Sequence, residues 1–414
     1  MRILCSCLLL TLLLVSSARG ADAENGDALL RDGDRVVLLG GTFIERMQMY
    51  GYVETALTAL HPDKDITFRN LGWSGDEVSG VARAVFGNTD NGYKRLIDDL
   101  VAAKPTVILV AYGANEAYRG PEQLEQFSAG LNRLLDRLGE TPARLVLLTP
   151  LRHENLGAPL PPPAQYNQSV AVYRDAILNL AESRKLPVLD LYSLISGDDA
   201  SPAPIDRLTD NGLHLSGYGY WRAAQHIAQE LGREPPKWTV DLDAAGKSRD
   251  TAGTTLSDVT PTALGLRFVA HDAALPFPPA PKYSPESAGR LIPSRELRIT
   301  GLAAGDYDVL IDGRKALSAS SDELARGVAL TAGPEPSQIE RLRREIGKKN
   351  ELFFHRYRPQ NETYLFLFRK HEQGNNAVEI PMFDPLIEQQ EALIAKLRQP
   401  EKHTYEIKIT RAKP

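Results

Sequence analysis

Residues 36–46 read Val-Val-Leu-Leu-Gly-Gly-Thr-Phe-Ile-Glu-Arg, an apolar run followed by two glycines and a hydroxyl residue. An apolar run without alternation is typical of a strand buried on both faces of a parallel sheet. The glycines allow a sharp turn at the carboxyl end of that strand, the edge where open α/β sheets bind ligands. We therefore expect Thr42 at a functional edge. The same residues also fit a capping box, in which Thr42 and Glu45 bond backbone N–H groups at a helix start.

Strands and helices alternate from this stretch onward. We expect apolar strands at 36–39, 66–69, 106–111, 144–149 and 188–192, and helices at 45–60, 93–103, 121–138, 166–184 and 220–231. This alternation predicts an α/β domain with a doubly wound parallel sheet. At 414 residues the chain is too long for one ordinary domain, so we expect an α/β domain over 24–234 and a second domain over 235–414.

The composition excludes some classes of partner. A net charge of −5, with no basic stripe, argues against a surface for nucleic acid or for an anionic membrane. No arrangement of His, Asp and Glu has metal-ligand spacing, so we expect no metal and no cofactor. His153, in a proline-rich loop, is expected at the surface.

Residues 1–23 are predicted to be a signal peptide, because Arg2 precedes an apolar run over 3–15 and then a small-residue region. Gly20 and Ala23 both suit the residue before the cleavage site. The protein is therefore expected to be secreted or periplasmic, with no membrane attachment after cleavage. Both cysteines of the chain lie in the apolar run, so the mature protein would contain no disulfide.

Four polar, glycine-containing segments would meet at one edge of the predicted sheet. They are Gly40-Gly41-Thr42, Asn70-Leu71-Gly72, Gly113-Ala114-Asn115 and Asn211-Gly212-Leu213-His214. In this order they resemble the four blocks of the SGNH (GDSL-type) hydrolases, with Gly40-Gly41-Thr42-Phe43 where that family has Gly-Asp-Ser-Leu. The resemblance covers about residues 35–231 and implies a flavodoxin-like α/β fold and hydrolysis of carboxylic esters.

The resemblance also implies a role for each residue of the site. Thr42 would be the nucleophile and His214 the base that takes its proton. Gly72, Asn115 and the backbone N–H of Thr42 would form the oxyanion hole. On local grounds alone, Asn115 also fits a helix cap and Gly72 a left-handed turn.

Two positions depart from the family pattern. Thr42 stands for the nucleophilic serine, and its methyl group restricts the side chain at a sharp turn. Asn211 stands for the acid three residues before His214 and cannot stabilise an imidazolium as a carboxylate does. We therefore favour Asp210 over Asn211 as the group that orients His214, although these residues also suit a plain turn.

The second half is expected to be a small antiparallel β domain with a helical insertion over 321–400. Strands are predicted at 238–242, 265–270, 296–300, 307–311 and 404–409, with a hairpin at Asp312-Gly313. An aromatic strand is expected to end at Phe368. If this segment covers the first domain's site, Arg358, Gln360 and His371 are candidate substrate contacts; otherwise it is an amphipathic strand with a charged loop.

These patterns lead to two hypotheses. The first is an exported ester hydrolase that removes O-acyl groups from carbohydrates, so its partner would be a small-molecule or glycan ester. The second is a binding protein with the same fold that has lost its nucleophile and holds a glycan or polymer. The replacements at Thr42 and Asn211 favour the second hypothesis.

Overall fold

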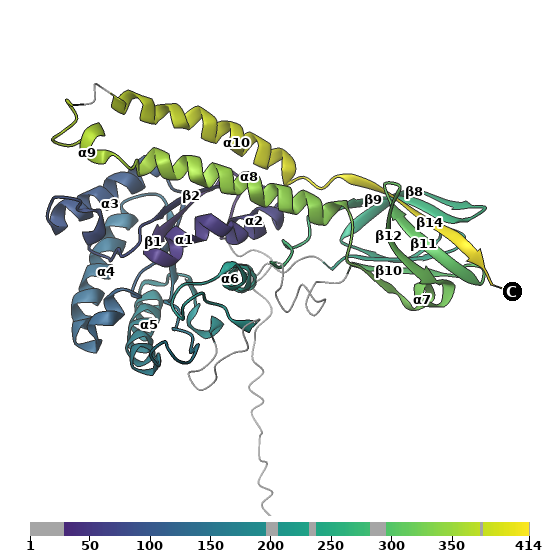
Figure 1. Cartoon of the computed structure of the whole chain (residues 1–414), viewed down its shortest axis with the longest axis horizontal. Helices are drawn as coiled ribbons and strands as arrows, with labels where there is room; N and C mark the ends of the chain where they lie inside the picture. Colours follow the sequence, from purple (N-terminus) through teal and green to yellow (C-terminus); the bar gives the residue numbers. More distant parts are fainter. Residues whose placement is uncertain (1–28, 196–205, 232–236, 282–294, 373–375, 414) are drawn as a thin grey trace, which may run out of the picture.

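The computed structural model describes residues 29–195, 206–231, 237–281, 295–372 and 376–413. The predicted signal peptide lies outside these ranges. An α/β domain lies at one end of the molecule and a β-rich domain at the other, and the long helix α8 (Pro334–Tyr357) runs between them (Figure 1). No helix in the described ranges combines the length and the apolar character needed to cross a membrane.

The α/β domain is built on a parallel sheet with strand order β2-β1-β3-β4-β5. Its strands are β1 (Arg35–Gly40), β2 (Thr67–Gly72), β3 (Val107–Ala111), β4 (Arg144–Leu148) and β5 (Val188–Leu189). Its helices are α1 (Thr42–Tyr50), α2 (Tyr52–Ala59), α3 (Thr89–Ala103), α4 (Leu124–Gly139), α5 (Ala164–Arg184) and α6 (Gly217–Glu230). This order is that of flavodoxin-like folds, so the predicted fold class is confirmed.

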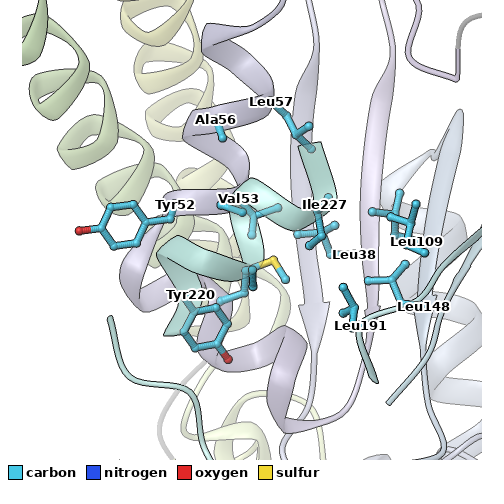
Figure 2. Close-up of a cluster of buried hydrophobic side chains, with 14 of the residues drawn as sticks. Leu38, Tyr52, Val53, Ala56, Leu57, Leu109, Leu148, Leu191, Tyr220 and Ile227 are labelled. Atoms are coloured by element: carbon cyan, nitrogen blue, oxygen red, sulfur yellow. The ribbon is translucent and has the colours of Figure 1, made fainter. Parts of the chain in front are cut away.

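Strand β1 is buried on both faces, as its unalternated apolar sequence predicts. Val36 and Leu38 pack in one core with residues of α2 and α6, part of which Figure 2 shows. Val37 and Leu39 pack on the opposite face with residues of α3, α4 and α5. Both faces of the strand are therefore shielded from water from Val36 to Gly40.

The prediction of a single helix over 45–60 is wrong, because the chain forms two helices there. Gly51 separates α1 from α2 and adopts a left-handed conformation with φ of 67°. Its N–H group donates to the carbonyl of Met47 and closes α1, and the chain restarts at Tyr52. A left-handed residue costs little at glycine, so the sequence carried a signal for this break.

The β-rich domain contains two sheets around one core. One has the order β13-β10-β6-β7 and the other β12-β11-β14-β9-β8, and apolar side chains of both form a shared cluster. β6 and β10 pair in parallel, so the domain is not wholly antiparallel as expected. The elements are β6 (Thr239–Asp243), β7 (Ser248–Ala252), β8 (Thr254–Thr262), β9 (Gly265–Asp272), β10 (Arg295–Thr300), β11 (Gly305–Ile311), β12 (Arg314–Ser320), α7 (Ser321–Arg326), β13 (Val328–Leu330) and β14 (Lys402–Ala412).

The helical insertion packs on the α/β domain. Helix α8 and helix α10 (Phe383–Leu397) contact each other, and α8 also contacts α1, α2 and the edge strand β2. The Lys349 ammonium and the Tyr357 hydroxyl donate to the carbonyls of Phe68 and Gly72 at 3.0 and 2.7 Å. These donors satisfy part of a sheet edge that would otherwise stay open. The prediction of an aromatic strand ending at Phe368 is wrong. The segment forms the short helix α9 (Glu362–Leu365), which is followed by turns.

Candidate active site

A cavity of about 90 Å³ lies at the carboxyl edge of the parallel sheet. It is bounded by the start of α1, the segments that follow β3 and β4, and the loop before α6. Three of the predicted site residues, Thr42, Asn115 and His214, line it. Other lining residues include Gly41, Arg46, Asp76, Glu116, Tyr118, His153, Tyr166 and Leu213. The topology therefore brings residues from distant parts of the chain to one place.

The hydroxyl of Thr42 faces the loop that follows β2. Thr42 is the first residue of α1, and the helix has no side-chain cap. Its Oγ1 accepts the backbone N–H of Gly75 at 3.2 Å. The Glu45 carboxylate instead accepts the Ser74 backbone N–H at 2.7 Å and the Ser74 hydroxyl at 2.8 Å. The capping-box interpretation is therefore wrong, and Thr42 Oγ1 is turned away from its own helix.

Gly72 has a packing role in this geometry. A Cβ atom at this position would lie 2.1 Å from the Glu45 backbone nitrogen, so only glycine lets α1 approach β2 so closely. The Gly72 N–H donates to Asn70 Oδ1 at 2.8 Å and is therefore not free for a substrate. The prediction that Gly72 supplies an oxyanion donor is corrected, because the glycine N–H beside Thr42 belongs to Gly75. The doublet Ser74-Gly75 in the same loop was the signal for it.

Asn115 lies across the cavity and is tied to the same loop. Its Nδ2 donates to the backbone carbonyl of Asp76 at 3.0 Å. The Asp76 carboxylate is itself buried and binds the Arg83 guanidinium at 2.7 Å and the Tyr112 hydroxyl at 3.0 Å. A buried ion pair with these extra hydrogen bonds fixes the end of the loop, because breaking it would leave an unpaired buried charge.

The side chain that meets the His214 ring is that of Asn211, whereas Asp210 bonds to His214 through its backbone N–H, which donates to the His214 carbonyl at 2.9 Å. Asn211 Nδ2 lies 3.2 Å from His214 Nδ1. Asp210 forms an ion pair with Arg46 at 3.1 Å. The preference for Asp210 as the orienting group is therefore corrected, because Arg46 from α1 holds that carboxylate. Among the described residues, no hydrogen bond joins His214 to Thr42, although both line the cavity.

The environment keeps His214 neutral. Burial lowers its pKa below the ordinary value, and the nearby Arg46 charge lowers it further, while Asp210 partly opposes both. The loop that carries the ring is fixed by Glu154, whose carboxylate accepts the backbone N–H groups of Leu208 and Thr209 at 3.0 and 2.8 Å. A neutral imidazole on a fixed loop can accept a proton near neutral pH.

An aromatic group forms one wall of the cavity. The His153 ring stacks on Tyr166 with centroids 3.7 Å apart, and the Tyr118 hydroxyl lies 3.2 Å from His153 Nε2. Burial, with a contribution from His214, lowers the pKa of His153 to about 4. His153 therefore forms part of the cavity wall. The prediction that it lies at the open surface, which was based on its position in a proline-rich loop, is wrong. No sequence motif marked this group.

The three residues predicted as substrate contacts have different surroundings. Arg358 lies 2.6 Å from Glu45 Oε2, and its guanidinium stacks 3.7 Å from the Trp73 ring centroid. It therefore reaches the loop beside Thr42 but does not line the cavity. Gln360 and His371 are exposed and also lie outside the lining. Within the described ranges, no group of three His, Cys, Asp or Glu side chains could hold a metal ion.

Comparisons with known proteins agree with the fold. A family model described as GDSL-like lipase/acylhydrolase matches residues 48–222, which include Asn115 and His214 but begin after Thr42. The structure of BT4096, a gut microbial diltiazem-metabolizing enzyme, is 16% identical, with a TM-score of 0.72 over 92% of this chain and 98% of that one. An acetylxylan esterase from Geobacillus stearothermophilus is 20% identical, with a TM-score of 0.40 over 50% of this chain and 97% of its own. A search of curated proteins gave no match.

Proposed function

The α/β domain of this chain belongs to the GDSL-like lipase/acylhydrolase family, and on this premise we propose that the protein hydrolyses carboxylic esters through Thr42. The observation that carries the proposal is the hydrogen bond from Gly75 N–H to Thr42 Oγ1 at the rim of a cavity that His214 also lines. A nucleophile, a base and a backbone donor are the parts that acyl transfer needs.

In the proposed mechanism, Thr42 Oγ1 attacks the ester carbonyl carbon while its proton passes to Nε2 of His214. The carbonyl oxygen becomes an oxyanion. Gly75 N–H shifts to it from Thr42 Oγ1 as that atom bonds to the substrate, and the second N–H of Asn115 Nδ2, which the Asp76 carbonyl does not use, also donates to it. When the tetrahedral intermediate collapses, the alcohol leaves with the proton from His214. Water then attacks the acyl-threonine by the same route, and the carboxylic acid is released.

The size of the cavity favours a short acyl group. Its volume of about 90 Å³ is well below the roughly 300–1,000 Å³ of pockets for drug-sized ligands. The alcohol part of the ester would lie at the rim, where Tyr118 and Leu213 are exposed. We propose O-acyl groups on carbohydrates as substrates, because a sugar ring can stack on an exposed tyrosine and bond to the polar rim.

Export is part of the same proposal. Residues 1–23 carry the charge and hydropathy pattern of a signal peptide, and a substrate on an extracellular polymer would require secretion or a periplasmic location. Mass spectrometry of the mature protein tests this point. A first residue of Ala21 or Glu24 would support cleavage after Gly20 or Ala23, and an intact Met1 in the exported fraction would contradict it.

One observation favours the alternative, a binding protein with an impaired site. The Asn211 amide N–H faces His214 Nδ1, where an esterase needs a group that accepts a hydrogen bond from the ring N–H. In that case the cavity and rim would hold an acylated glycan without cleaving it. The two functions make opposite predictions for turnover.

The test compares turnover of p-nitrophenyl acetate and acetylated xylan by the mature protein and its variants. Thr42→Ala and His214→Ala should abolish turnover, and Thr42→Ser should retain or raise it. His371→Ala is the matched control, since this histidine is exposed and lies outside the cavity. Turnover that is absent in the parent, or unaffected by the two cavity variants, would contradict the proposal. Calorimetry with acetylated oligosaccharides would then test binding.

A further inference from the structure

Helix α8 is anchored at both ends and along its length. Near its start, Glu335 binds Arg295 of the β-rich domain at 2.6 Å. Along its middle, the buried Lys349 ammonium binds Glu54 of α2 at 2.7 Å. Figure 1 shows α8 crossing from the β-rich domain over α2 toward α3. A helix held by buried ion pairs presents the residues at its end in a fixed position.

The end of α8 touches the loop that follows β2. The Arg358 guanidinium lies 2.6 Å from Glu45 Oε2 and stacks on Trp73 at 3.7 Å, while the Tyr357 hydroxyl donates to the Gly72 carbonyl at 2.7 Å. Trp73 is buried, so this stacking takes place away from water. Stacked and ion-paired arginine contacts of this kind are specific to the planar guanidinium.

Glu45 links Arg358 to the loop that follows β2, which contains Ser74 and Gly75. Its carboxylate accepts Ser74 N–H and Ser74 Oγ as well as Arg358, and the next residue, Gly75, donates to Thr42 Oγ1. The other end of the loop is fixed by the ion pair of Asp76 with Arg83. Gly75 itself has φ of 77° and would meet no atom within 4 Å if it carried a Cβ. The position of the Gly75 N–H therefore depends on the contacts of the adjacent residues Ser74 and Asp76, and not on packing around Gly75 itself.

We propose that Arg358, from the second half of the chain, is a positioning residue for the oxyanion donor Gly75. It acts through Glu45 and Trp73, which hold Ser74 and the start of the loop, and does not touch the substrate. The catalytic part of this inference rests on the proposed ester hydrolysis, whereas the loop contact does not. The insertion thus completes the active site of the first domain.

Hydrogen–deuterium exchange of the peptide that covers residues 72–77 tests the loop contact independently of activity. In Arg358→Ala we expect exchange to be about tenfold faster, as for loss of a hydrogen bond to a charged group. Arg356→Ala is the matched control: this arginine lies on the same helix end but binds Asp384 of α10 at 2.8 Å. Equal exchange in the two variants would overturn the proposal.

Kinetics of ester hydrolysis test the consequence. Arg358→Ala should lower kcat by roughly 10- to 100-fold with little change in KM, because a displaced donor weakens transition-state binding. Arg358→Lys should recover part of this loss, since it keeps the charge beside Glu45 but not the stacking. Arg356→Ala should keep the parent kcat. Faster exchange with an unchanged kcat would overturn the catalytic role. An inactive parent would contradict the proposed function, and the exchange experiment would still decide the loop contact.

Discussion

The side-chain nitrogen of Asn211 lies 3.2 Å from Nδ1 of His214, while Asn211 Oδ1 accepts the backbone N–H groups of Leu213 and His214 at 3.2 and 2.9 Å. Because two backbone donors occupy the amide oxygen, the amide N–H faces the ring, and Nδ1 must accept it. The neutral ring then carries its proton on Nε2. The base in the proposed mechanism is the other tautomer, with the proton on Nδ1, and the contact with the Asn211 amide lowers its population and so slows the proton transfer from Thr42.

Asn211→Asp should therefore increase kcat for p-nitrophenyl acetate. A carboxylate would accept a hydrogen bond from Nδ1–H, which leaves Nε2 unprotonated as the base, and its charge would stabilise the imidazolium. The reverse change in a serine-protease triad costs about 10⁴ in rate, which sets the upper limit of the expected gain. Nitrogen-15 NMR should show the ring proton on Nε2 in the parent and on Nδ1 in the variant.

The double variant Thr42→Ala with Asn211→Asp is the control for this prediction. It should have no more activity than Thr42→Ala alone, because the gain requires the nucleophile. A folded Asn211→Asp protein with the parent tautomer and the parent kcat would show that the amide does not set the protonation of His214.

The pH profile of kcat/KM should report the surroundings of His214. Burial and the Arg46 charge lower the pKa of this imidazole. The neutral ring is the base, so activity is lost as the pH falls through the folded-state pKa, and the acidic limb should lie below pH 6.5, the ordinary histidine value. Arg46→Gln should move this limb to higher pH, since it removes the cation and leaves Asp210 without its partner.

Arg137→Gln is the control for this pH profile, because Arg137 pairs with Glu140 at the end of α4, away from the cavity. Its acidic limb should coincide with that of the parent. A limb in Arg46→Gln that stays in place or moves to lower pH would contradict the assignment of this limb to His214.

The sequence predicted the parallel sheet and its functional edge because these follow from local patterns. The unalternated run of β1 needs burial on both faces, and a polar segment after each strand is visible without coordinates. Other features depend on contacts between distant residues. Gly72 ends β2 and Gly75 lies in the loop that follows. Gly72 is identified as a packing residue by its close approach to Glu45 and by the bond of its N–H group to Asn70, and neither contact is visible in the sequence. Likewise, the pairing of Arg46 with Asp210 could not be inferred from either segment alone.

The different roles of Gly72 and Gly75 predict different costs of adding a methyl group. Gly72→Ala should lower the free energy of unfolding by about 3 kcal/mol or more, because the new Cβ would lie 2.1 Å from the Glu45 nitrogen and backbone atoms cannot move aside cheaply. Gly75→Ala should cost only about 1–2 kcal/mol, for its left-handed conformation, since the Cβ would enter open space. Urea unfolding measures both. Equal costs would contradict the close packing of α1 on β2.

Glu116 predicts a specific pH dependence of stability. Its side chain is buried, and its carboxylate accepts the backbone N–H groups of Val78 and Gly113, both at 2.9 Å. Burial outweighs these hydrogen bonds and raises its pKa from 4.5 to about 7. The folded protein therefore binds this proton more tightly than the unfolded chain does. Its contribution to stability is present below about pH 4.5 and is lost as the pH rises through about 7.

Urea unfolding of the parent and of Glu116→Gln at about pH 5 and about pH 8 should show this effect, because glutamine does not titrate. Relative to the variant, the parent should lose on the order of 3 kcal/mol of unfolding free energy across that range. Glu122→Gln, an exposed neighbour along the chain, is the control and should keep the parent's pH dependence. A parent that gains stability relative to Glu116→Gln as the pH rises would mean that the carboxylate is charged in the fold, and its hydrogen bonds to Val78 and Gly113 would then outweigh its burial.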